Sequence, residues 1–109
     1  MKQFENITLT TSTGEIIKDQ PTGKELNARN IILILLDNSK YENQEDQRRG
    51  FKLHDKVEKL PKKSKTLQLE DSEFDLVKKY ADKFDPFLTG LVWMPFKNAL
   101  ADAKDVETK

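Results

Sequence analysis

The fold of this chain is constrained most by one uninterrupted run of six aliphatic residues, Ile31 to Leu36, in a sequence that is otherwise rich in charge. Charged residues make up 35% of the chain and hydrophobic residues 36%, whereas average domains have more apolar residues and fewer charges. As a helix, the run would span about 9 Å, far less than a bilayer core. We therefore expect it to form the centre of a thin protein core, and we expect no membrane association.

The segment around this run predicts a helix from about Gly23 to Asp37. Thr22 and Glu25 fit the capping-box pattern, in which a threonine hydroxyl and a glutamate each satisfy a free backbone N–H at the start of a helix. A short aliphatic run is also compatible with a buried strand, and the spacing of Leu26 and Ala28 favours the helix. The residues that would share its buried face are Ala28, Ile31, Ile32, Leu35 and Leu36.

Two stretches show the pattern of strands. Residues 4–18 alternate between apolar and polar side chains up to a turn at Ser12-Thr13-Gly14, and Ile16 begins a return strand, so we expect a β-hairpin. Residues 66–69 (TLQL) predict one further short strand. Because two strands alone are marginally stable, the hairpin should pack on the helices.

Two more helices are predicted in the middle of the chain. Asn43 suits the N-cap of a helix over residues 44–60. Gly50 inside this helix indicates either a close approach by another backbone or a later start of the helix. Residues 72–84, capped by Asp71, carry apolar side chains at helical spacing.

The C-terminal part predicts a turn of helix over residues 86–91 and a final helix over residues 94–104. Pro95 either kinks one helix or opens a new one, and residues 105–109 should fray. Together the elements predict an α+β, mainly helical fold: an N-terminal β-hairpin packed on about four helices, with one further short strand. The 109 residues suit a single domain over residues 1–109, since domains usually run roughly 100–150 residues.

The composition argues against catalysis and against a bound metal or cofactor. The chain has no cysteine and one histidine, His54, which excludes thiolate zinc sites and cysteine nucleophiles. His54 could pair with Glu58 one turn along its helix, but a surface or half-buried structural histidine is the preferred interpretation. The four scattered glycines form no phosphate loop. The carboxylates Glu70, Asp71, Glu73 and Asp75 are explained by the start of a helix.

A run of lysines is the only local feature that suggests an anionic partner. Five lysines, offset only by Glu58, stand between residues 56 and 65: Lys56, Lys59, Lys62, Lys63 and Lys65. Acidic and basic residues balance at 19 each, no aromatic side chains interleave with the lysines to stack bases, and a solvated helix end is the preferred interpretation. Contact with nucleic acid phosphates or with an acidic protein remains the alternative.

The apolar stretch near the C-terminus is the stronger candidate for a functional surface. It concentrates large apolar residues around Pro95, more than one helix face can bury. Core packing is the preferred interpretation for most of this stretch, and exposure of some of these residues is the alternative. Aromatic residues and methionine are enriched in interface cores. We expect part of this stretch to be covered by a partner protein or by a second copy of the chain, with Leu91, Trp93, Met94 and Phe96 as the candidate interface residues.

Several segments together resemble small proteins of about this length from tailed bacteriophages and prophages. The resemblance rests on TGKELNARNIILILL, RRGFKLHDKV, LQLEDSEFDLVKKYADK and FLTGLVWMPFKNAL, with LxLEDSEF at the entry to the third predicted helix as its specific element. It implies a phage origin and the cytoplasm of a bacterial host, and it carries over no functional residue. The resulting expectation is a non-enzymatic protein that acts by protein–protein contact, as an assembly accessory or an inhibitor of a host protein. The alternative is a nucleic-acid-associated regulator that uses the lysines between residues 56 and 65.

Overall fold

The computed structural model describes residues 1–109 except 12, 19–22, 62–63, 84–92 and 107–109. The described residues form a mainly helical α+β fold, as predicted. Its elements in chain order are β1 (Lys2–Glu5), α1 (Ala28–Asn38), α2 (Gln44–Glu58), β2 (Thr66–Leu69), α3 (Asp71–Lys83), α4 (Met94–Ala101) and β3 (Lys104–Asp105).

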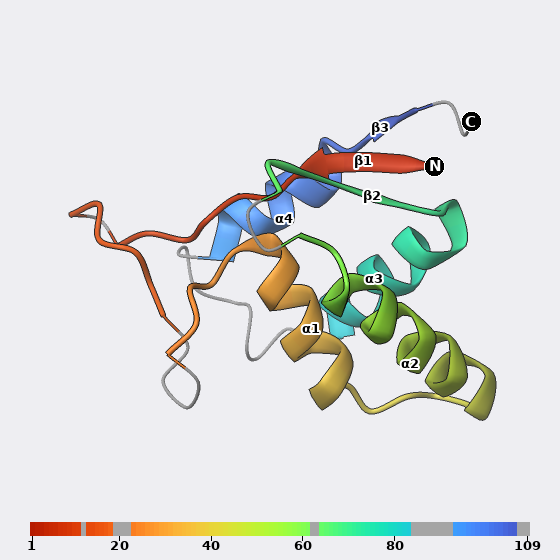
Figure 1. Ribbon diagram of the computed structural model, residues 1–109. Helices are drawn as coiled ribbons and strands as arrows, with labels where there is room; N and C mark the ends of the chain where they lie inside the picture. The colour runs from red at the N-terminus through yellow and green to blue at the C-terminus, as the bar shows by residue number, and fades with distance from the viewer. Residues whose placement is uncertain (12, 19–22, 62–63, 84–92, 107–109) are drawn as a thin grey trace.

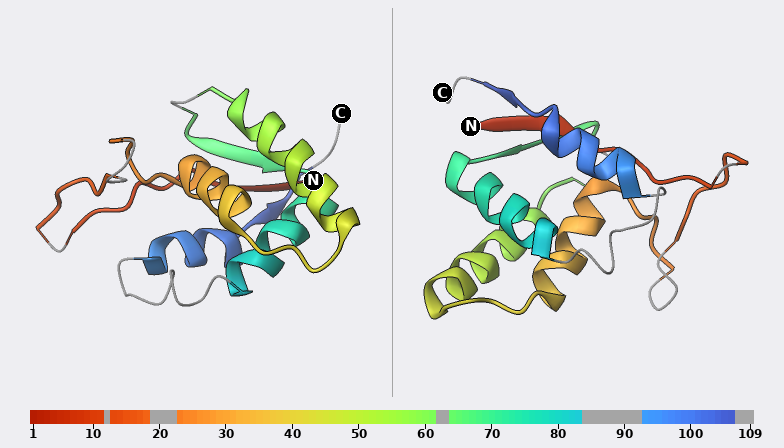
Figure 2. Two further views of the ribbon diagram at one scale, coloured as in Figure 1. Left: turned by 90° about the horizontal axis from the view of Figure 1, so that it is seen from below. Right: turned by 180° about the vertical axis from the view of Figure 1, so that it is seen from behind.

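The described strands form an antiparallel sheet in the order β2-β1-β3, so the first strand of the chain lies in the middle. Phe4 pairs with Leu67, and Gln3 pairs with both Gln68 and Lys104. The helices α1, α2 and α3 lie together on one side of this sheet, and α4 runs beside β1 (Figures 1 and 2). The sheet therefore joins segments that are far apart in the sequence.

The core lies where the sheet and the helices meet. The aliphatic run supplies its centre, with Ile31, Ile32, Leu35 and Leu36 buried and Leu33 and Ile34 packed on the flank. The other elements contribute the buried residues Phe4, Leu53, Val57, Leu67, Leu69, Phe74, Val77, Tyr80, Phe96 and Leu100. The prediction that the run forms a helix at the centre of a core is confirmed.

Helix α1 begins later than predicted. Its N-cap is Asn27, whose side-chain oxygen accepts a hydrogen bond from the backbone N–H of Asn30 at 2.9 Å. Gly23 has a φ of +69°, which is not helical, and Leu26 is extended, with its N–H donating to the carbonyl of Ile17. The capping-box prediction is therefore wrong at Glu25, which makes a bridge to Lys18; Thr22 lies outside the described residues.

The turn of the predicted hairpin is present, but the segments on either side of it do not form two regular strands. Gly14 has a φ of +89° and its N–H donates to the carbonyl of Thr11, so the turn is where the sequence places it. Among the described residues on either side of the turn, the pairing consists of an isolated bridge between Thr10 and Ile16 and of backbone hydrogen bonds from Thr11 to Glu15 and from Ile17 to Leu9. The regular strand lies earlier, in β1, because residues 2–5 find partners in β2 and β3.

The described residues between 7 and 27 instead form an arm that leaves the body of the molecule (Figures 1 and 2). Its base is held by a closed cycle of backbone hydrogen bonds. The N–H of Leu9 donates to Leu26, that of Leu26 to Ile17, and that of Ile17 back to Leu9, at 2.9–3.0 Å. Leu9 and Leu26 are buried, so the cycle anchors the arm on the core.

The other helices follow the predictions closely. Asn43 caps α2 by accepting the N–H of Asp46 at 2.8 Å, and Pro95 stands in the first turn of α4, so it opens that helix. The last helix ends at Ala101 rather than Lys104, because Lys104 and Asp105 pair with β1 as β3. Asp105 is thus part of the sheet and not of a frayed tail. The predicted helical turn at residues 86–91 lies outside the described residues.

Candidate functional site

The structure places the described residues of the candidate C-terminal interface in different environments. Phe96 has an exposed fraction of 0%, because it faces inward from α4. Trp93 is half-buried and packs against the core. Met94 remains exposed at 43%, and Leu91 lies outside the described residues. Of the four predicted residues, Phe96 is therefore not accessible to a partner, and Met94 alone presents a large exposed surface among those described.

The lysines between residues 56 and 65 do not form one free basic patch. Lys56 pairs with Glu73 at 2.8 Å and Lys59 pairs with Asp55 at 3.0 Å. Lys65 is exposed, while Lys62 and Lys63 lie outside the described residues. Lys56 and Lys59 thus each have a local acidic partner, although the exposed Lys59–Asp55 pair is a weak one.

The most exposed large apolar side chain among the described residues is Phe51 on α2, at 77%. It stands at the rim of a groove of about 460 Å³ between the end of α1 and one face of α2. We call this the α1–α2 groove, and its lining residues are Leu36, Asp37, Tyr41, Gln47, Gly50, Phe51, His54, Asp55 and Glu58. The groove combines an aromatic rim with carboxylates and one imidazole.

Gly50 and Tyr41 both line the groove and lie against each other. A Cβ atom at Gly50 would lie 2.5 Å from the hydroxyl oxygen of Tyr41, so the glycine permits a close approach by a side chain rather than by a backbone. The Tyr41 hydroxyl donates to the carbonyl of Leu36 at 2.6 Å, and its ring lies 4.9 Å from that of Tyr80. Burial raises the pKa of Tyr41, so this hydroxyl stays protonated at neutral pH.

His54 links the two helices across the groove. Its Nε2 lies 3.1 Å from a carboxylate oxygen of Asp37, at the end of α1, and its Nδ1 lies 3.5 Å from Glu58, as the i, i+4 spacing predicts. The contact with Asp37 could not be read from the sequence, because it joins two different helices. The imidazole is half-buried, which agrees with a structural histidine.

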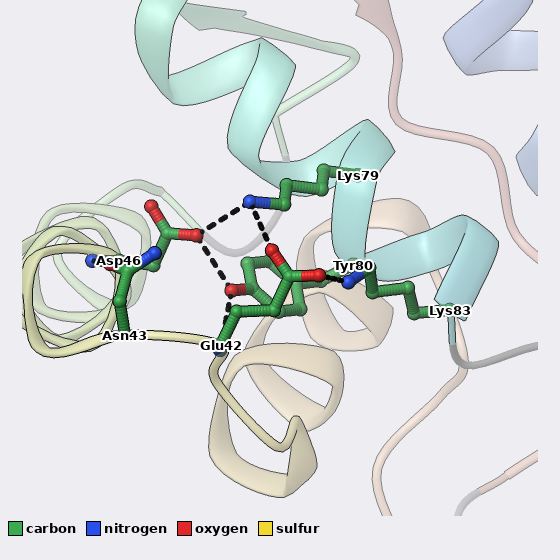
Figure 3. Close-up of polar contacts among 6 residues, drawn as sticks. All are labelled: Glu42, Asn43, Asp46, Lys79, Tyr80 and Lys83. Atoms are coloured by element: carbon green, nitrogen blue, oxygen red, sulfur yellow. Dashed lines mark hydrogen bonds and ion pairs between the residues drawn. The ribbon is translucent and has the colours of Figure 1, made fainter.

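A cluster of polar side chains holds the loop that forms one wall of the groove (Figure 3). We call it the loop clamp, and it consists of Glu42, Asn43, Asp46, Lys79, Tyr80 and Lys83. One oxygen of the buried Asp46 accepts the Tyr80 hydroxyl at 2.7 Å and Lys79 Nζ at 2.8 Å. The Tyr80 hydroxyl in turn accepts the backbone N–H of Glu42 at 3.1 Å. Glu42 also pairs with Lys79 and Lys83, so α3 fixes the loop from two sides.

The loop clamp shifts the ionisation of its members. Hydrogen bonds from Lys79 and from Tyr80 hold the pKa of Asp46 below its usual value. The hydrogen bond to Asp46 raises the pKa of Lys79, and burial, followed by the bond to Asp46, raises the pKa of Tyr80. At neutral pH the clamp therefore contains a charged carboxylate, a charged amine and a protonated phenol.

The clamp should make stability depend on pH in acid. The pKa of Asp46 is lower in the folded than in the unfolded chain. Ionised Asp46 therefore contributes to the free energy of unfolding in full above the unfolded pKa of about 3.9. This contribution is lost as the pH falls through the folded pKa. We expect the Asp46→Asn variant to lose part of this acid-dependent decline. Urea unfolding at about pH 7 and about pH 3 measures the difference in the free energy of unfolding between the two conditions.

Asp105→Asn is the comparison for this prediction: its carboxylate also has a lowered pKa, caused by Lys2, but it is exposed on the sheet, so solvent screens the pair and the variant should lose a smaller part of the decline. A pH dependence that is identical in Asp46→Asn and in the unmodified protein would contradict the prediction.

Sequence reasoning missed Phe51, although a signal was present. Leu53 and Val57 define the buried stripe of α2, and a residue two positions before Leu53 lies about 200° away on the helix. Phe51 is thus directed away from the core by spacing alone. Asp37 and Tyr41 carried no such signal, because their roles depend on the angle between α1 and α2.

The groove offers ionic and aromatic contacts rather than a metal centre or a nucleophile. Among the described residues, no group of three histidine or acidic side chains is arranged to hold a metal ion.

No helix in the described part of the chain is long and apolar enough to cross a membrane. Comparisons with protein-family models, curated proteins and solved structures found no match to this chain.

Proposed function

We propose that this chain is a small phage-type protein that acts by binding another protein, without catalysing a reaction, and that the α1–α2 groove is its contact surface. The observation that carries the proposal is the 77% exposure of Phe51 beside a groove of about 460 Å³. Aromatic anchors next to pockets supply most of the energy of many protein interfaces. An assembly accessory and an inhibitor of a host protein would both use such a surface.

The chemistry of the groove supports binding over catalysis. His54 has a carboxylate beside each ring nitrogen, and the hydroxyl among the lining residues, that of Tyr41, donates to the Leu36 carbonyl. No lining residue is a serine, threonine, cysteine or lysine, so none of these side chains is present in the groove for His54 to activate. The same groups are suited to charged and aromatic contacts with a protein chain.

The loop clamp supports the proposal because its hydrogen bonds and ion pairs hold the loop that lines the groove against α3. Asp46 and Tyr80 fix the loop that carries Tyr41, and Tyr41 packs on Tyr80. A surface that is ordered before its partner arrives loses less conformational entropy on binding. The groove thus already has its shape before a partner binds.

The test is a pull-down from bacterial lysate, with and without nuclease, using the unmodified protein, Phe51→Glu and Met94→Glu. We expect a nuclease-resistant partner whose affinity falls at least roughly tenfold in Phe51→Glu, as for an interface hot spot. Met94→Glu is the matched control, because Met94 is also an exposed apolar residue. Circular dichroism should show that both variants fold, since exposed substitutions usually change stability by less than about 0.5 kcal/mol.

Three results would contradict the proposal. A partner that Phe51→Glu retains in full would remove the groove as the contact surface. A partner lost in Met94→Glu instead would favour the surface predicted around Trp93 and Met94. Binding that disappears with nuclease would favour the alternative function, a regulator that contacts nucleic acid through Lys56, Lys59, Lys62, Lys63 and Lys65.

A further inference from the structure

We infer that the α1–α2 groove binds an arginine-bearing helical segment of the partner protein, with one guanidinium group lying on the ring of Phe51 and hydrogen-bonded to the neighbouring carboxylates. This inference rests on the proposed function and deepens it by naming the chemistry of the bound segment. It follows from three features of the groove: the sign of its charges, the exposed aromatic face, and the geometry around His54.

The charges of the groove have one sign. Asp37, Asp55 and Glu58 line it, and none of the lining residues is a lysine or an arginine. Asp37 and Glu58 have side chains that are 65% and 62% exposed, so a ligand can reach them. Asp55 contacts Lys59, but both side chains are exposed, and such surface pairs are weak. The complementary ligand is therefore cationic.

The aromatic rim makes a planar cation more suitable than a compact one. Phe51, Asp55 and Glu58 are spaced i, i+4 and i+7, which places them along one face of α2. A guanidinium group stacks on an aromatic face and donates to a carboxylate in the same plane, whereas an ammonium group is a strongly hydrated point charge. An arginine on Phe51 would thus reach the carboxylate one turn along the helix.

His54 positions two of the carboxylates through its ring nitrogens. The imidazole lies between Asp37 and Glu58, at 3.1 and 3.5 Å, and so keeps the two acidic side chains on either side of the groove. A guanidinium carries its charge at every physiological pH and offers five donors. It can therefore replace or share the contacts that His54 makes with these carboxylates.

A helical segment could present an apolar anchor and an arginine to the groove at the same time. The groove lies between the end of α1 and a face of α2, and its lining includes apolar and aromatic residues as well as the carboxylates. An amphipathic helix places apolar anchors and charged residues at adjacent turns, which is how helices dock in grooves of other proteins. The half-buried Tyr41 would contact an apolar anchor, and Phe51 and the carboxylates would contact the arginine.

The experiment measures the binding of fluorescent helical peptides to the full chain by anisotropy. The probes are about 15 residues long, to allow helix formation, and share leucines on one face. They differ only in carrying arginine, lysine or neutral citrulline on the flank. We expect the arginine peptide to bind severalfold more tightly than the lysine peptide and roughly tenfold or more above the citrulline peptide.

Matched variants identify the site of binding. Phe51→Ala, and the double variant Asp37→Asn with Glu58→Gln, should each weaken the arginine peptide at least severalfold. A control double variant, Glu15→Gln with Asp82→Asn, removes the same formal charge from exposed positions outside the groove and should leave binding unchanged. Circular dichroism of all variants checks that they are folded.

The results separate this inference from the proposed function. Equal binding of the citrulline and arginine peptides, equal loss in both double variants, or no binding of any peptide would overturn the arginine inference. The proposed function would then still stand if the Phe51→Glu protein fails to retain its partner from lysate. Self-association of the free protein through the groove, seen by sedimentation and lost in Phe51→Glu, would show that the occupant is a second copy and would overturn the inference as well.

Discussion

Replacing Leu35 by alanine should lower the free energy of unfolding by about 2–5 kcal/mol. Leu35 is 2% exposed and lies on the inner face of α1, the helix at the centre of the core. Removal of its side chain leaves a cavity that the surrounding packed side chains refill only in part. Because a domain of this size is stable by only about 5–15 kcal/mol, the loss would be severe. Urea unfolding followed by circular dichroism measures it.

Leu33→Ala is the matched control for this prediction. It makes the same chemical change on the same helix, but Leu33 is only partly buried. The loss at position 33 should therefore be clearly smaller than at position 35. Equal midpoints for Leu35→Ala and the unmodified protein would show that the aliphatic run does not form the core.

Replacing Arg29 by methionine should also destabilise the fold, by about 1–3 kcal/mol for each buried group left without a partner. Arg29 is a charged residue of α1 that is only 3% exposed. Its guanidinium donates to the carbonyls of Glu58 at 2.8 Å and of Leu60 at 3.3 Å, and to the side chain of Asn30 at 2.8 Å. It thus satisfies carbonyls at the C-terminal end of α2, where a positive charge is also favoured by the helix dipole.

Two further variants make this prediction specific. Arg29→Lys keeps the charge but not the planar fork of donors, so it should restore only part of the lost stability. Arg48→Met removes an exposed arginine from α2 and should leave the unfolding midpoint nearly unchanged. Full stability in Arg29→Met would mean that water satisfies the two carbonyls and that Arg29 does not hold α1 and α2 together.

Arg29 and the loop clamp together bear on the proposed binding surface. Arg29 ties the end of α2 to the start of α1, while Asp46 and Tyr80 tie the start of α2 to α3. The α1–α2 groove lies between these two attachments. We therefore expect substitutions at either attachment to weaken binding indirectly, through the stability of the fold, and binding data on such variants should be compared at equal fractions of folded protein.

The sequence by itself determined the elements whose signals are local. The bounds of β2, the Asn43 cap of α2 and the approximate extent of α3 were predicted nearly to the residue, because capping and helical periodicity involve residues within about four positions of each other. The same reasoning placed the aliphatic run in a buried helix. The outward position of Phe51 on α2 follows from the same periodicity.

Only the tertiary structure decided the features that join distant segments. Residues 2–5 form a strand because residues 66–69 and 104–105 pair with them. Helix α1 begins later than predicted because the backbone of Leu26 is hydrogen-bonded to Leu9 and Ile17. Phe96 entered the core, while Arg29 and Asp46 were buried with partners more than 28 residues away in the sequence. The free energy of such contacts depends on how helices and strands pack, which no short stretch of sequence contains, and the α1–α2 groove is a product of that packing.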